Sequence, residues 1–303
     1  MSTSTDFSGL WIPLITPFSA GVIDLPALKK LVRRLRADGV HGLVVCGTTG
    51  EAAALDDHEQ LRLLDTVLGC ADGLPVVMGV AGANQSKVCA WLKQVDQHPL
   101  AGVLVSAPHT IRPSQEGLTG WFTTLADLSR VPVLIYDIPY RTGATLQRDT
   151  LLALAEHPNI AAVKDCGGDP GKTLALIAQG RLQVLAGEDL QIFSTLALGG
   201  RGAIAASAHL ATDQFVRLIR LLQAGALHDA RVLWHALVPW IESVFAQPNP
   251  APIKAMLAHL GEVDAQLRAP LVPVSIAHLG TMQRLHQRLC GPIQSGSDQV
   301  NRQ

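Results

Sequence analysis

Eight short apolar runs punctuate the first two thirds of this 303-residue chain, and they constrain its fold more than any other feature. Between them lie longer amphipathic stretches in which apolar residues recur every three or four positions, as at Leu28, Leu31 and Leu35. The runs show no polar alternation, which is typical of parallel strands covered on both faces. They occupy residues 10–15, 42–46, 75–79, 102–106, 131–136, 160–164, 182–186 and 203–206.

The spacing of these runs predicts the fold class. A strand-plus-helix unit of roughly 27 residues is typical of a (β/α)8 TIM barrel, which takes about 250 residues in all. An open doubly wound sheet is the alternative, but it would carry a Gly-x-Gly-x-x-Gly turn after an early strand, and the sequence has none. We therefore predict an α/β TIM barrel with an appended C-terminal helical region.

The domain organisation follows from where the strand pattern stops. We predict a barrel over residues 1–225, C-terminal helices over 226–294 and a polar tail over 295–303. The helical patterns beyond the last strand are found at residues 210–224, 227–245, 253–260 and 275–289.

Composition limits the partners. Lys plus Arg is 24 against 25 for Asp plus Glu, so the basic excess of a nucleic-acid-binding protein is missing. No apolar run approaches the roughly 18–20 residues of a membrane span, and the N-terminus does not read as a signal peptide. The five cysteines are scattered without a Cys-x-x-Cys pair, which argues against disulfides or structural zinc. We expect a cytoplasmic protein with no nucleic-acid or membrane partner.

The carboxyl ends of barrel strands are the expected location of a catalytic site, and the sixth run ends at Lys164. The chain has seven lysines, and this one alone ends an apolar strand. Burying an ammonium group is costly, so this position favours a desolvated, nucleophilic amine that forms Schiff bases with ketones and aldehydes. The alternative is a lysine that extends to solvent or pairs with a carboxylate such as Asp165 or Glu188.

Two further strand ends carry polar motifs. Gly-Thr-Thr-Gly-Glu at residues 47–51 can gather backbone N–H groups and hydroxyls around an anion such as a substrate carboxylate. Tyr-Asp-Ile-Pro-Tyr-Arg-Thr-Gly at residues 136–143 offers a tyrosine that can relay protons and an arginine that can bind a carboxylate. Taken singly, the first motif is equally compatible with an ordinary turn, and the second with a core tyrosine and an exposed arginine.

These three motifs, in this order on these strands, resemble the dihydrodipicolinate synthase / N-acetylneuraminate lyase family of class I pyruvate-dependent aldolases. The resemblance extends from Ile-Thr-Pro-Phe at residues 15–18 to Gln-Pro-Asn-Pro at 247–250. Arg-Pro-Ser-Gln-Glu-Gly at 112–117 and Arg141 are similar to the synthase branch. The resemblance implies a lyase of lysine biosynthesis that condenses pyruvate with aspartate semialdehyde. It also implies no metal or other cofactor, and a homo-oligomer built as a dimer of dimers, a homotetramer.

The resemblance also implies catalytic roles for individual residues. Lys164 matches the Schiff-base lysine that condenses with pyruvate. Tyr136 matches the tyrosine that shuttles protons, and Thr48 matches its relay partner.

The substrate-binding residues implied by the resemblance surround these groups. Thr49, with the backbone of Gly47 and Gly50, would hold the pyruvate carboxylate, and Arg141 would receive the carboxylate of the second substrate. The pyruvate pocket would also be lined by backbone groups of Gly187 and Ile204.

The sequence departs from the family at residues 109–113, His-Thr-Ile-Arg-Pro, where synthases usually have Tyr-Tyr-Asn-Arg-Pro. The second tyrosine completes the proton relay across a subunit interface, and Thr110 replaces it here. His109, Tyr140 or water would have to complete the relay. Two alternatives to the synthase stay open: a pyruvate-dependent aldolase or lyase acting on a sugar acid or other 2-oxo acid, and a catalytically weak member with a binding role.

A second departure concerns regulation. Lysine-inhibited members of the family carry histidines and a tyrosine in an interface pocket. The matching positions here are Asp57, Gln60 and His109, so we expect no inhibition by lysine.

Two other patterns favour different chemistry less strongly. Cys-Gly-Gly-Asp-Pro-Gly-Lys-Thr at residues 166–173 nearly matches a phosphate-binding loop, but Cys166 replaces its first glycine and Pro170 lacks an N–H. We interpret it as a loop with an exposed Lys172. His228 and His235 lie seven apart on a predicted helix without a third ligand at metal-site spacing, so no metal site is expected.

Overall fold

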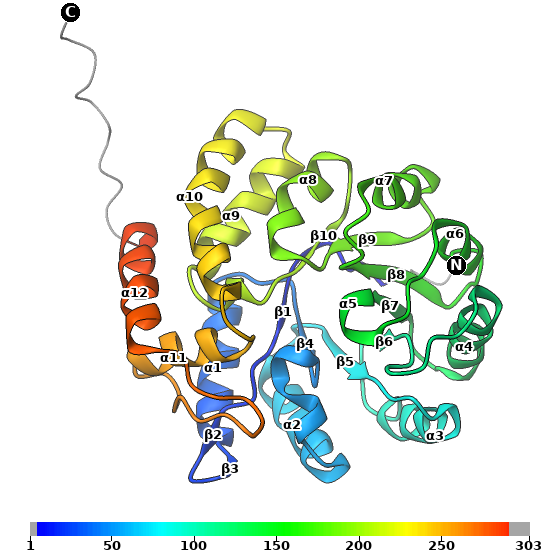
Figure 1. The fold of residues 1–303 in the computed structure, drawn as a ribbon, viewed down its shortest axis with the longest axis horizontal. Coiled ribbons are helices and arrows are strands. Elements are labelled where there is room, and N and C mark those ends of the chain that lie inside the picture. The colour runs from blue at the N-terminus through cyan, green and yellow to red at the C-terminus, as the bar shows by residue number, and fades with distance from the viewer. Residues whose placement is uncertain (1–4, 291–303) are drawn as a thin grey trace, which may run out of the picture.

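Eight parallel strands close into a barrel in the computed structural model, which describes residues 5–290 (Figure 1). Their order around the barrel is β1-β10-β9-β8-β7-β6-β5-β4, so neighbours in sequence are neighbours in space. The strands are β1 Gly9–Pro13, β4 Gly42–Val45, β5 Val76–Val80, β6 Gly102–Ser106, β7 Val133–Asp137, β8 Ile160–Asp165, β9 Gln183–Ala186 and β10 Gly202–Ile204. Each overlaps one of the eight apolar runs, which confirms the predicted TIM barrel.

A layer of helices surrounds the strands. The helices between and directly after the strands are α1 Leu25–Ala37, α2 Asp57–Ala71, α3 Gln85–Val95, α4 Gln115–Leu128, α5 Pro139–Thr142, α6 Arg148–Leu154, α7 Pro170–Gln179, α8 Ile192–Ala197 and α9 Thr212–Gln223. Local sequence begins several of them: Asp56 and Glu59 form a capping box at α2, and Ser114 accepts a hydrogen bond from the Gly117 N–H at α4.

Three more helices follow the barrel: α10 Leu227–Phe245, α11 Ala251–His259 and α12 Ile276–Cys290. They lie together at one side of the barrel, where α10 packs against α9 and α12 packs against α10 (Figure 1). The predicted helix at residues 227–245 has the observed bounds of α10, whereas the one at 253–260 begins two residues earlier, at Ala251. The tail predicted over residues 295–303 lies outside the described residues.

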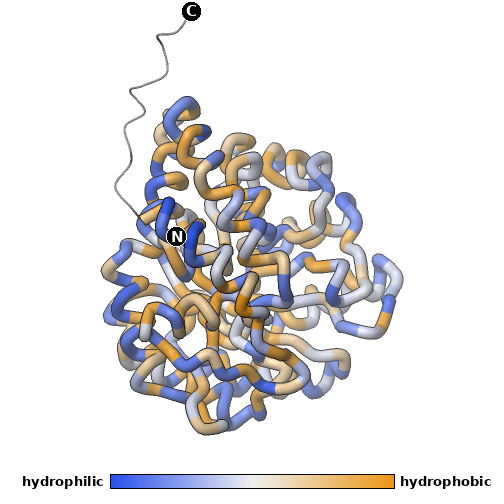
Figure 2. Tube along the Cα trace, turned by 60° about the vertical axis from the view of Figure 1, so that its left-hand side comes forward, coloured by the Kyte–Doolittle hydropathy of each residue, from blue (hydrophilic) through white to orange (hydrophobic). Residues whose placement is uncertain are grey.

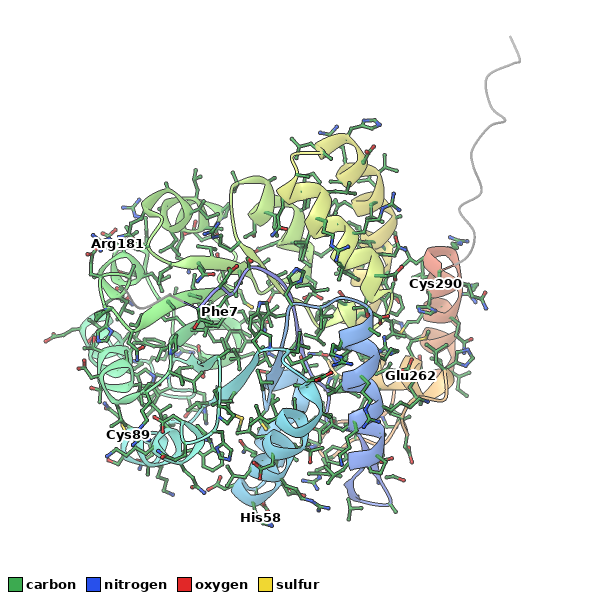
Figure 3. The ribbon with its side chains drawn as sticks, turned by 180° about the vertical axis from the view of Figure 1, so that it is seen from behind. Phe7, His58, Cys89, Arg181, Glu262 and Cys290 are labelled. Carbon is green, nitrogen blue, oxygen red and sulfur yellow. The ribbon has the colours of Figure 1, made fainter. Side chains whose placement is uncertain are left out.

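The interior of the barrel is a separate apolar cluster. Phe7 lies within the ring of strands (Figure 3), and its ring packs against that of Trp11 at a centroid distance of 5.5 Å. The strand residues of this cluster are Trp11, Val44, Val77, Leu104, Leu134, Ala162, Leu185 and Ile204. Because side chains alternate along a strand, the residues two positions later also face inward, toward the carboxyl end of the barrel.

Sequence reasoning missed the short elements. A two-stranded antiparallel sheet, β2 Phe18–Ser19 with β3 Val22–Ile23, precedes α1. The 3₁₀ turns η1 Thr48–Gly50, η2 Ala52–Ala54, η3 Asp189–Gln191 and η4 Ser207–His209 follow strands of the barrel. These elements are too short to produce a periodic pattern.

Hydrophilic residues are concentrated at the outside of the molecule. Figure 2 shows hydrophilic residues gathered on the outer helices and connecting loops. All five cysteines are free thiols, and Cys89 and Cys290 lie on opposite sides of the molecule (Figure 3). Within residues 5–290, no helix combines the length and apolarity needed to cross a membrane.

Candidate active site

Lys164 and Tyr136 lie side by side at the carboxyl end of the barrel. Strands β7 and β8 place the two residues opposite each other in register. Each stands two positions beyond an interior residue, Leu134 or Ala162, so both side chains face into the barrel mouth. The Lys164 Nζ lies 4.3 Å from the centroid of the Tyr136 ring, and the lysine side chain is buried, with 6% of its surface exposed. The structure thus brings together the lysine and the tyrosine for which the sequence analysis predicted catalytic roles.

Lys164 differs from the two other buried lysines. Lys172 forms an ion pair with Asp137, and Lys254 forms one with Glu51. Among the ion pairs of residues 5–290, none involves Lys164, so its expected alternative as the partner of Asp165 or Glu188 is wrong. A buried amine that is not committed to a carboxylate is available to react.

The Tyr136 hydroxyl is kept in its neutral form. Burial raises the pKa of the Tyr136 phenol well above its usual value, and the nearby Cys166 acts in the same direction. The nearby Thr48 side chain and the charge of Arg141 oppose this shift without cancelling it. Tyr136 therefore carries its proton at neutral pH and can donate it to a group at Lys164.

The turn at residues 47–51 is fixed from several directions. Thr16 donates a hydrogen bond from its Oγ1 to the Gly50 carbonyl at 2.7 Å. A side chain at position 50 would place its Cβ 2.9 Å from the Leu14 carbonyl oxygen, so the close approach requires glycine. Thr48 is exposed at the mouth, while Thr49 is buried. The first N–H groups of such a 3₁₀ turn have no partner inside the turn, which suits the binding of an anion.

The C-terminal helical region holds this turn in place, a contribution that sequence reasoning missed. Asn249 donates a hydrogen bond from its Nδ2 to Thr49 Oγ1 at 2.9 Å. Lys254 donates to the buried Glu51 carboxylate, which also accepts a hydrogen bond from the Arg268 backbone N–H at 2.9 Å. The only available signal was a lysine inside the otherwise apolar pattern of the α11 helix.

Gly187 forms the wall of the mouth beside Lys164, and Ile204 lies in the interior cluster of the barrel. A Cβ at position 187 would lie 2.4 Å from Cys166 Sγ and 2.8 Å from Lys164 Cγ, so only glycine fits beside the lysine. Ile204 ends β10 and is fully buried in the interior cluster. Gly187 therefore borders Lys164, whereas Ile204 shares the interior cluster with Ala162, two positions before Lys164.

A polar group lies above this wall. Tyr140 donates a hydrogen bond from its hydroxyl to Glu188 Oε1 at 2.9 Å. Burial raises the pKa of the Cys166 thiol well above its usual value, and the nearby Glu188 acts in the same direction. The Arg141 guanidinium carbon lies 5.5 Å from the centroid of the Tyr140 ring, a cation–π contact. Arg141 itself is exposed, so it is open to a ligand.

Thr110 is not brought into contact with Tyr136. It is exposed in the loop after β6, and its Oγ1 donates to the His109 carbonyl at 2.6 Å. Its φ of 65° is unusual for a β-branched residue and costs about 1–3 kcal/mol of strain. Within residues 5–290, no hydrogen bond joins Thr110, His109 or Tyr140 to the Tyr136 hydroxyl.

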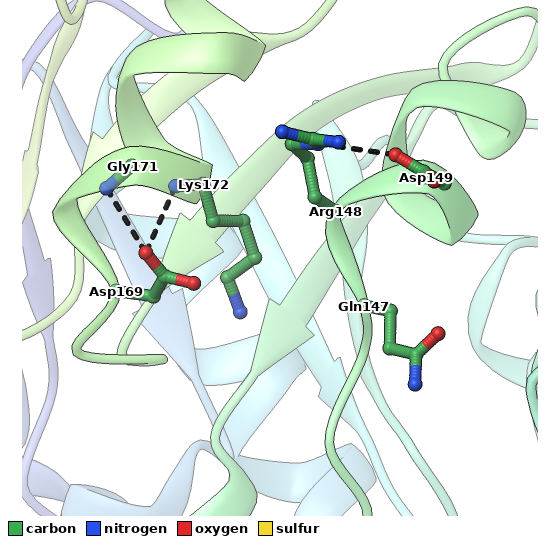
Figure 4. Close-up of a pocket in the computed structure, with 6 residues that line it drawn as sticks. All are labelled: Gln147, Arg148, Asp149, Asp169, Gly171 and Lys172. Carbon is green, nitrogen blue, oxygen red and sulfur yellow. Dashed lines mark hydrogen bonds and ion pairs between the residues drawn. The ribbon is translucent and has the colours of Figure 1, made fainter.

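Lys172 is buried, with 3% of its surface exposed, so the prediction of an exposed loop lysine is wrong. The physical reason is Asp137, which points out of the barrel toward α7 and pairs with the Lys172 ammonium. Figure 4 shows a surface hollow beside this segment, lined by Gln147, Arg148, Asp149, Asp169, Gly171 and Lys172. Asp169 accepts hydrogen bonds from the Gly171 and Lys172 N–H groups at 2.9 and 3.1 Å, so the donors that a phosphate would need are already used.

Within the described chain, no group of three or more His, Cys, Asp or Glu side chains has an arrangement that could hold a metal ion. His228 is exposed on α10. The chemistry visible at the barrel mouth is that of an amine, a phenol, hydroxyls, a carboxylate and a guanidinium.

Known proteins share both the sequence and this architecture. The model of the dihydrodipicolinate synthetase family matches residues 6–288. The 4-hydroxy-tetrahydrodipicolinate synthase 2 of Clostridium acetobutylicum is 37% identical over 88% of this chain and 95% of its own length. The 4-hydroxy-tetrahydrodipicolinate synthase of Enterococcus faecalis is 36% identical over 86% of this chain and 91% of its own length.

Solved structures agree. A monomeric dihydrodipicolinate synthase variant has a TM-score of 0.92 at 28% identity, covering 96% of this chain and 99% of that one. The dihydrodipicolinate synthase of Acinetobacter baumannii, solved in complex with pyruvate, has a TM-score of 0.90 at 27% identity, covering 93% and 98%. On sequence, fold and the geometry of the barrel mouth, this chain belongs to the dihydrodipicolinate synthetase family.

Proposed function

We propose that this protein is a Schiff-base lyase that condenses pyruvate with aspartate semialdehyde, the activity of a 4-hydroxy-tetrahydrodipicolinate synthase. One observation carries the proposal: Lys164 is a buried amine without a carboxylate partner among the described residues, directly beside a neutral tyrosine. The names of the relatives and the pyruvate complex of the Acinetobacter baumannii enzyme support the choice of substrates.

Lys164 supplies the nucleophile in this mechanism. Its amine attacks the C2 carbonyl of pyruvate, the carbinolamine loses water, and a protonated imine forms. Loss of a proton from C3 gives an enamine that attacks the aldehyde carbon. The protonated imine is itself the electron sink, so the chemistry calls for no metal or other cofactor.

Tyr136 moves protons during these steps. Its phenol protonates the carbinolamine oxygen so that the oxygen leaves as water, and Thr48 passes protons to and from the tyrosine. The raised pKa of Tyr136 suits a group that must hold a proton until the carbinolamine forms.

Thr49 and the turn around it bind the pyruvate carboxylate. Asn249 already donates to the Thr49 oxygen, so the Thr49 hydroxyl proton is free to point to the substrate. The backbone of Gly47 and Gly50 shapes this cradle. Arg141 binds the carboxylate of the aldehyde substrate through its planar fork.

Borohydride reduction in the presence of pyruvate tests the proposal. We expect a pyruvate-derived mass on the Lys164 peptide only. Lys172 and Lys254 are equally buried and serve as internal controls, because their amines are held by carboxylates. Label on another lysine, or none, would refute the mechanism. Activity should also survive treatment with EDTA and dialysis.

A second candidate function rests on Thr110. A pyruvate-dependent aldolase for a sugar acid or another 2-oxo acid would use the space that Thr110 leaves open. In a synthase, Thr110→Tyr should preserve or raise turnover with aspartate semialdehyde, and a relay group contributes about 10²–10⁴-fold. With a bulkier natural aldehyde, the same change should lower turnover. Product mass from a panel of aldehydes separates the two functions.

We further propose that the protein works as a homo-oligomer in the cytoplasm. Ile111, next to Thr110, is exposed to 49% of its surface, an apolar side chain in the loop that resembles an interface segment of the family. The monomeric variant among the similar structures has the same fold, so assembly is not a requirement of the barrel. Light scattering across a dilution series tests the assembly.

A further inference from the structure

A side-chain bridge crosses the barrel mouth above Lys164. Tyr140 follows β7, Cys166 follows β8 and Glu188 follows β9, and these three strands are consecutive neighbours in the barrel. The hydrogen bond of 2.9 Å from Tyr140 to Glu188 therefore spans the strand that carries Lys164. Cys166 approaches the same carboxylate from the middle strand. Glu188 is thus held at the mouth by a neutral donor, the Tyr140 hydroxyl.

Glu188 differs from the other carboxylates near the mouth. Asp137 and Glu51 each pair with a buried lysine, and Asp189 accepts hydrogen bonds from the backbone and hydroxyl of Ser207. Among the ion pairs of residues 5–290, none includes Glu188. Its side chain is half-buried, so a substrate at the mouth can reach it. A carboxylate in this state has room for a cationic partner.

Tyr140 lies between this anion and a cation. Its hydroxyl contacts Glu188, and its ring lies under the Arg141 guanidinium, 5.5 Å from ring centroid to guanidinium carbon. The two opposite charges are therefore presented on one side of the mouth, at the two ends of a single side chain. An α-amino acid end group carries the complementary pair, a carboxylate and an ammonium on the same carbon.

We propose that Glu188 is the residue that recognises the ammonium group of the aldehyde substrate, so that the enzyme selects an amino-acid semialdehyde over an aldehyde that lacks the amine. This inference rests on the proposed function, since it assumes that Arg141 binds the carboxylate of the same substrate. Tyr140 is a positioning residue that aims the Glu188 carboxylate. Glu188 makes no bond to the reacting carbons, so its effect falls on selection of the aldehyde and not on imine formation.

The test compares two aldehydes that differ only in the amine, aspartate semialdehyde and succinate semialdehyde, the latter used as substrate and as competitor. Glu188→Gln keeps the shape and the acceptor oxygen but removes the charge. We expect kcat/KM for aspartate semialdehyde to fall by about tenfold or more, the range of a charge-assisted hydrogen bond. The KM for pyruvate, the borohydride trapping of Lys164 and the constants for succinate semialdehyde should stay unchanged.

Three further variants sharpen the comparison. Glu188→Asp retains the charge and should recover part of the preference. Tyr140→Phe keeps the ring beneath Arg141 and should show a smaller loss than Glu188→Gln, again confined to the aminated aldehyde. Glu242→Gln removes the same charge at an exposed position on α10 and controls for the electrostatic field of the whole protein. It should leave the kinetic constants for both aldehydes unchanged.

Equal losses for both aldehydes would show that Glu188 only supports the mouth and would overturn the inference, as would an unchanged constant for aspartate semialdehyde. Failure of the proposed function looks different, because the wild-type protein would then form the pyruvate imine yet turn over no aspartate semialdehyde. That result, obtained with the wild-type protein alone, would refute both the proposed synthase activity and the role of Glu188.

Discussion

His209 makes the stability of the barrel dependent on pH in a way that can be measured. It lies fully buried in η4, directly after β10. Its Nε2 accepts a hydrogen bond from the Ile15 backbone N–H at 3.2 Å, and its Nδ1 lies 2.8 Å from the Ala206 carbonyl. Only a neutral ring with the proton on Nδ1 satisfies both contacts. Protonation would turn the Nε2 acceptor into a donor that faces another donor.

The pKa of His209 gives the size and sign of the effect. Burial lowers the pKa from 6.5 to about 4, the Ala206 carbonyl offsets part of this, and the charge of Arg34 adds to it. Above pH 6.5 the ring is neutral in both the folded and the unfolded chain. As the pH falls from 6.5 toward 4, His209 binds a proton in the unfolded chain but stays neutral in the folded chain, so the folded state loses stability. The difference in pKa corresponds to about 3 kcal/mol of unfolding free energy.

Urea unfolding of the wild type and His209→Gln across this pH window isolates the effect. The variant should be less stable at neutral pH. The difference in unfolding free energy between the two proteins should narrow by about 3 kcal/mol as the pH falls from 6.5 to about 4. Asp189 has the opposite sign, because burial raises its pKa to about 6, but it is present in both proteins and cancels in the difference. His228→Gln, the same change at an exposed position on α10, serves as the matched control. A constant gap for His209→Gln would refute the reasoning.

Three other predictions concern buried contacts near the mouth. Lys172→Ala should cost about 3–5 kcal/mol in urea unfolding because it strands the Asp137 charge, whereas an apolar replacement of both residues should cost much less. Asn249→Ala should raise the KM for pyruvate about fivefold, the loss of one ordinary hydrogen bond, and should leave the KM for the aldehyde unchanged in steady-state assays. Gly187→Ala should suppress borohydride trapping of pyruvate, because its Cβ has no room beside the lysine, whereas Gly69→Ala in the open surface of α2 should not.

The barrel and its two central residues were predictable because they depend on local signals. A strand buried on both faces reads as an uninterrupted apolar run, and a charged or hydroxylated residue at its end is conspicuous. Lys164 and Tyr136 both stand at such ends, and the parallel order of neighbouring strands brings them together. No knowledge of the helix packing was needed for either.

The contacts that hold the mouth in shape could not be predicted in the same way. Asn249 and Thr49 are separated by 200 positions, and Lys254 and Glu51 by 203. Both pairs form only when the C-terminal helices dock against the turn after β4. Lys172 was predicted to be exposed because its sequence neighbours suggest a loop. Its partner Asp137 lies 35 positions earlier, at the end of β7, and is not visible from that local pattern. A pairing between distant segments leaves no periodic pattern in either one.

The alternation of side chains explains why two dipeptides on neighbouring strands, residues 136–137 on β7 and 164–165 on β8, serve both catalysis and stability. Tyr136 and Lys164 face into the barrel, so the following residues, Asp137 and Asp165, face outward and are also opposite each other in register. Asp137 pairs with Lys172, and Asp165 accepts a hydrogen bond from the Thr173 hydroxyl, both on α7. A slip of either strand by one residue would turn the carboxylates into the apolar barrel and the amine into the helix layer. The two buried contacts with α7, Asp137 to Lys172 and Asp165 to Thr173, therefore oppose any slip that would separate the reacting lysine from its tyrosine.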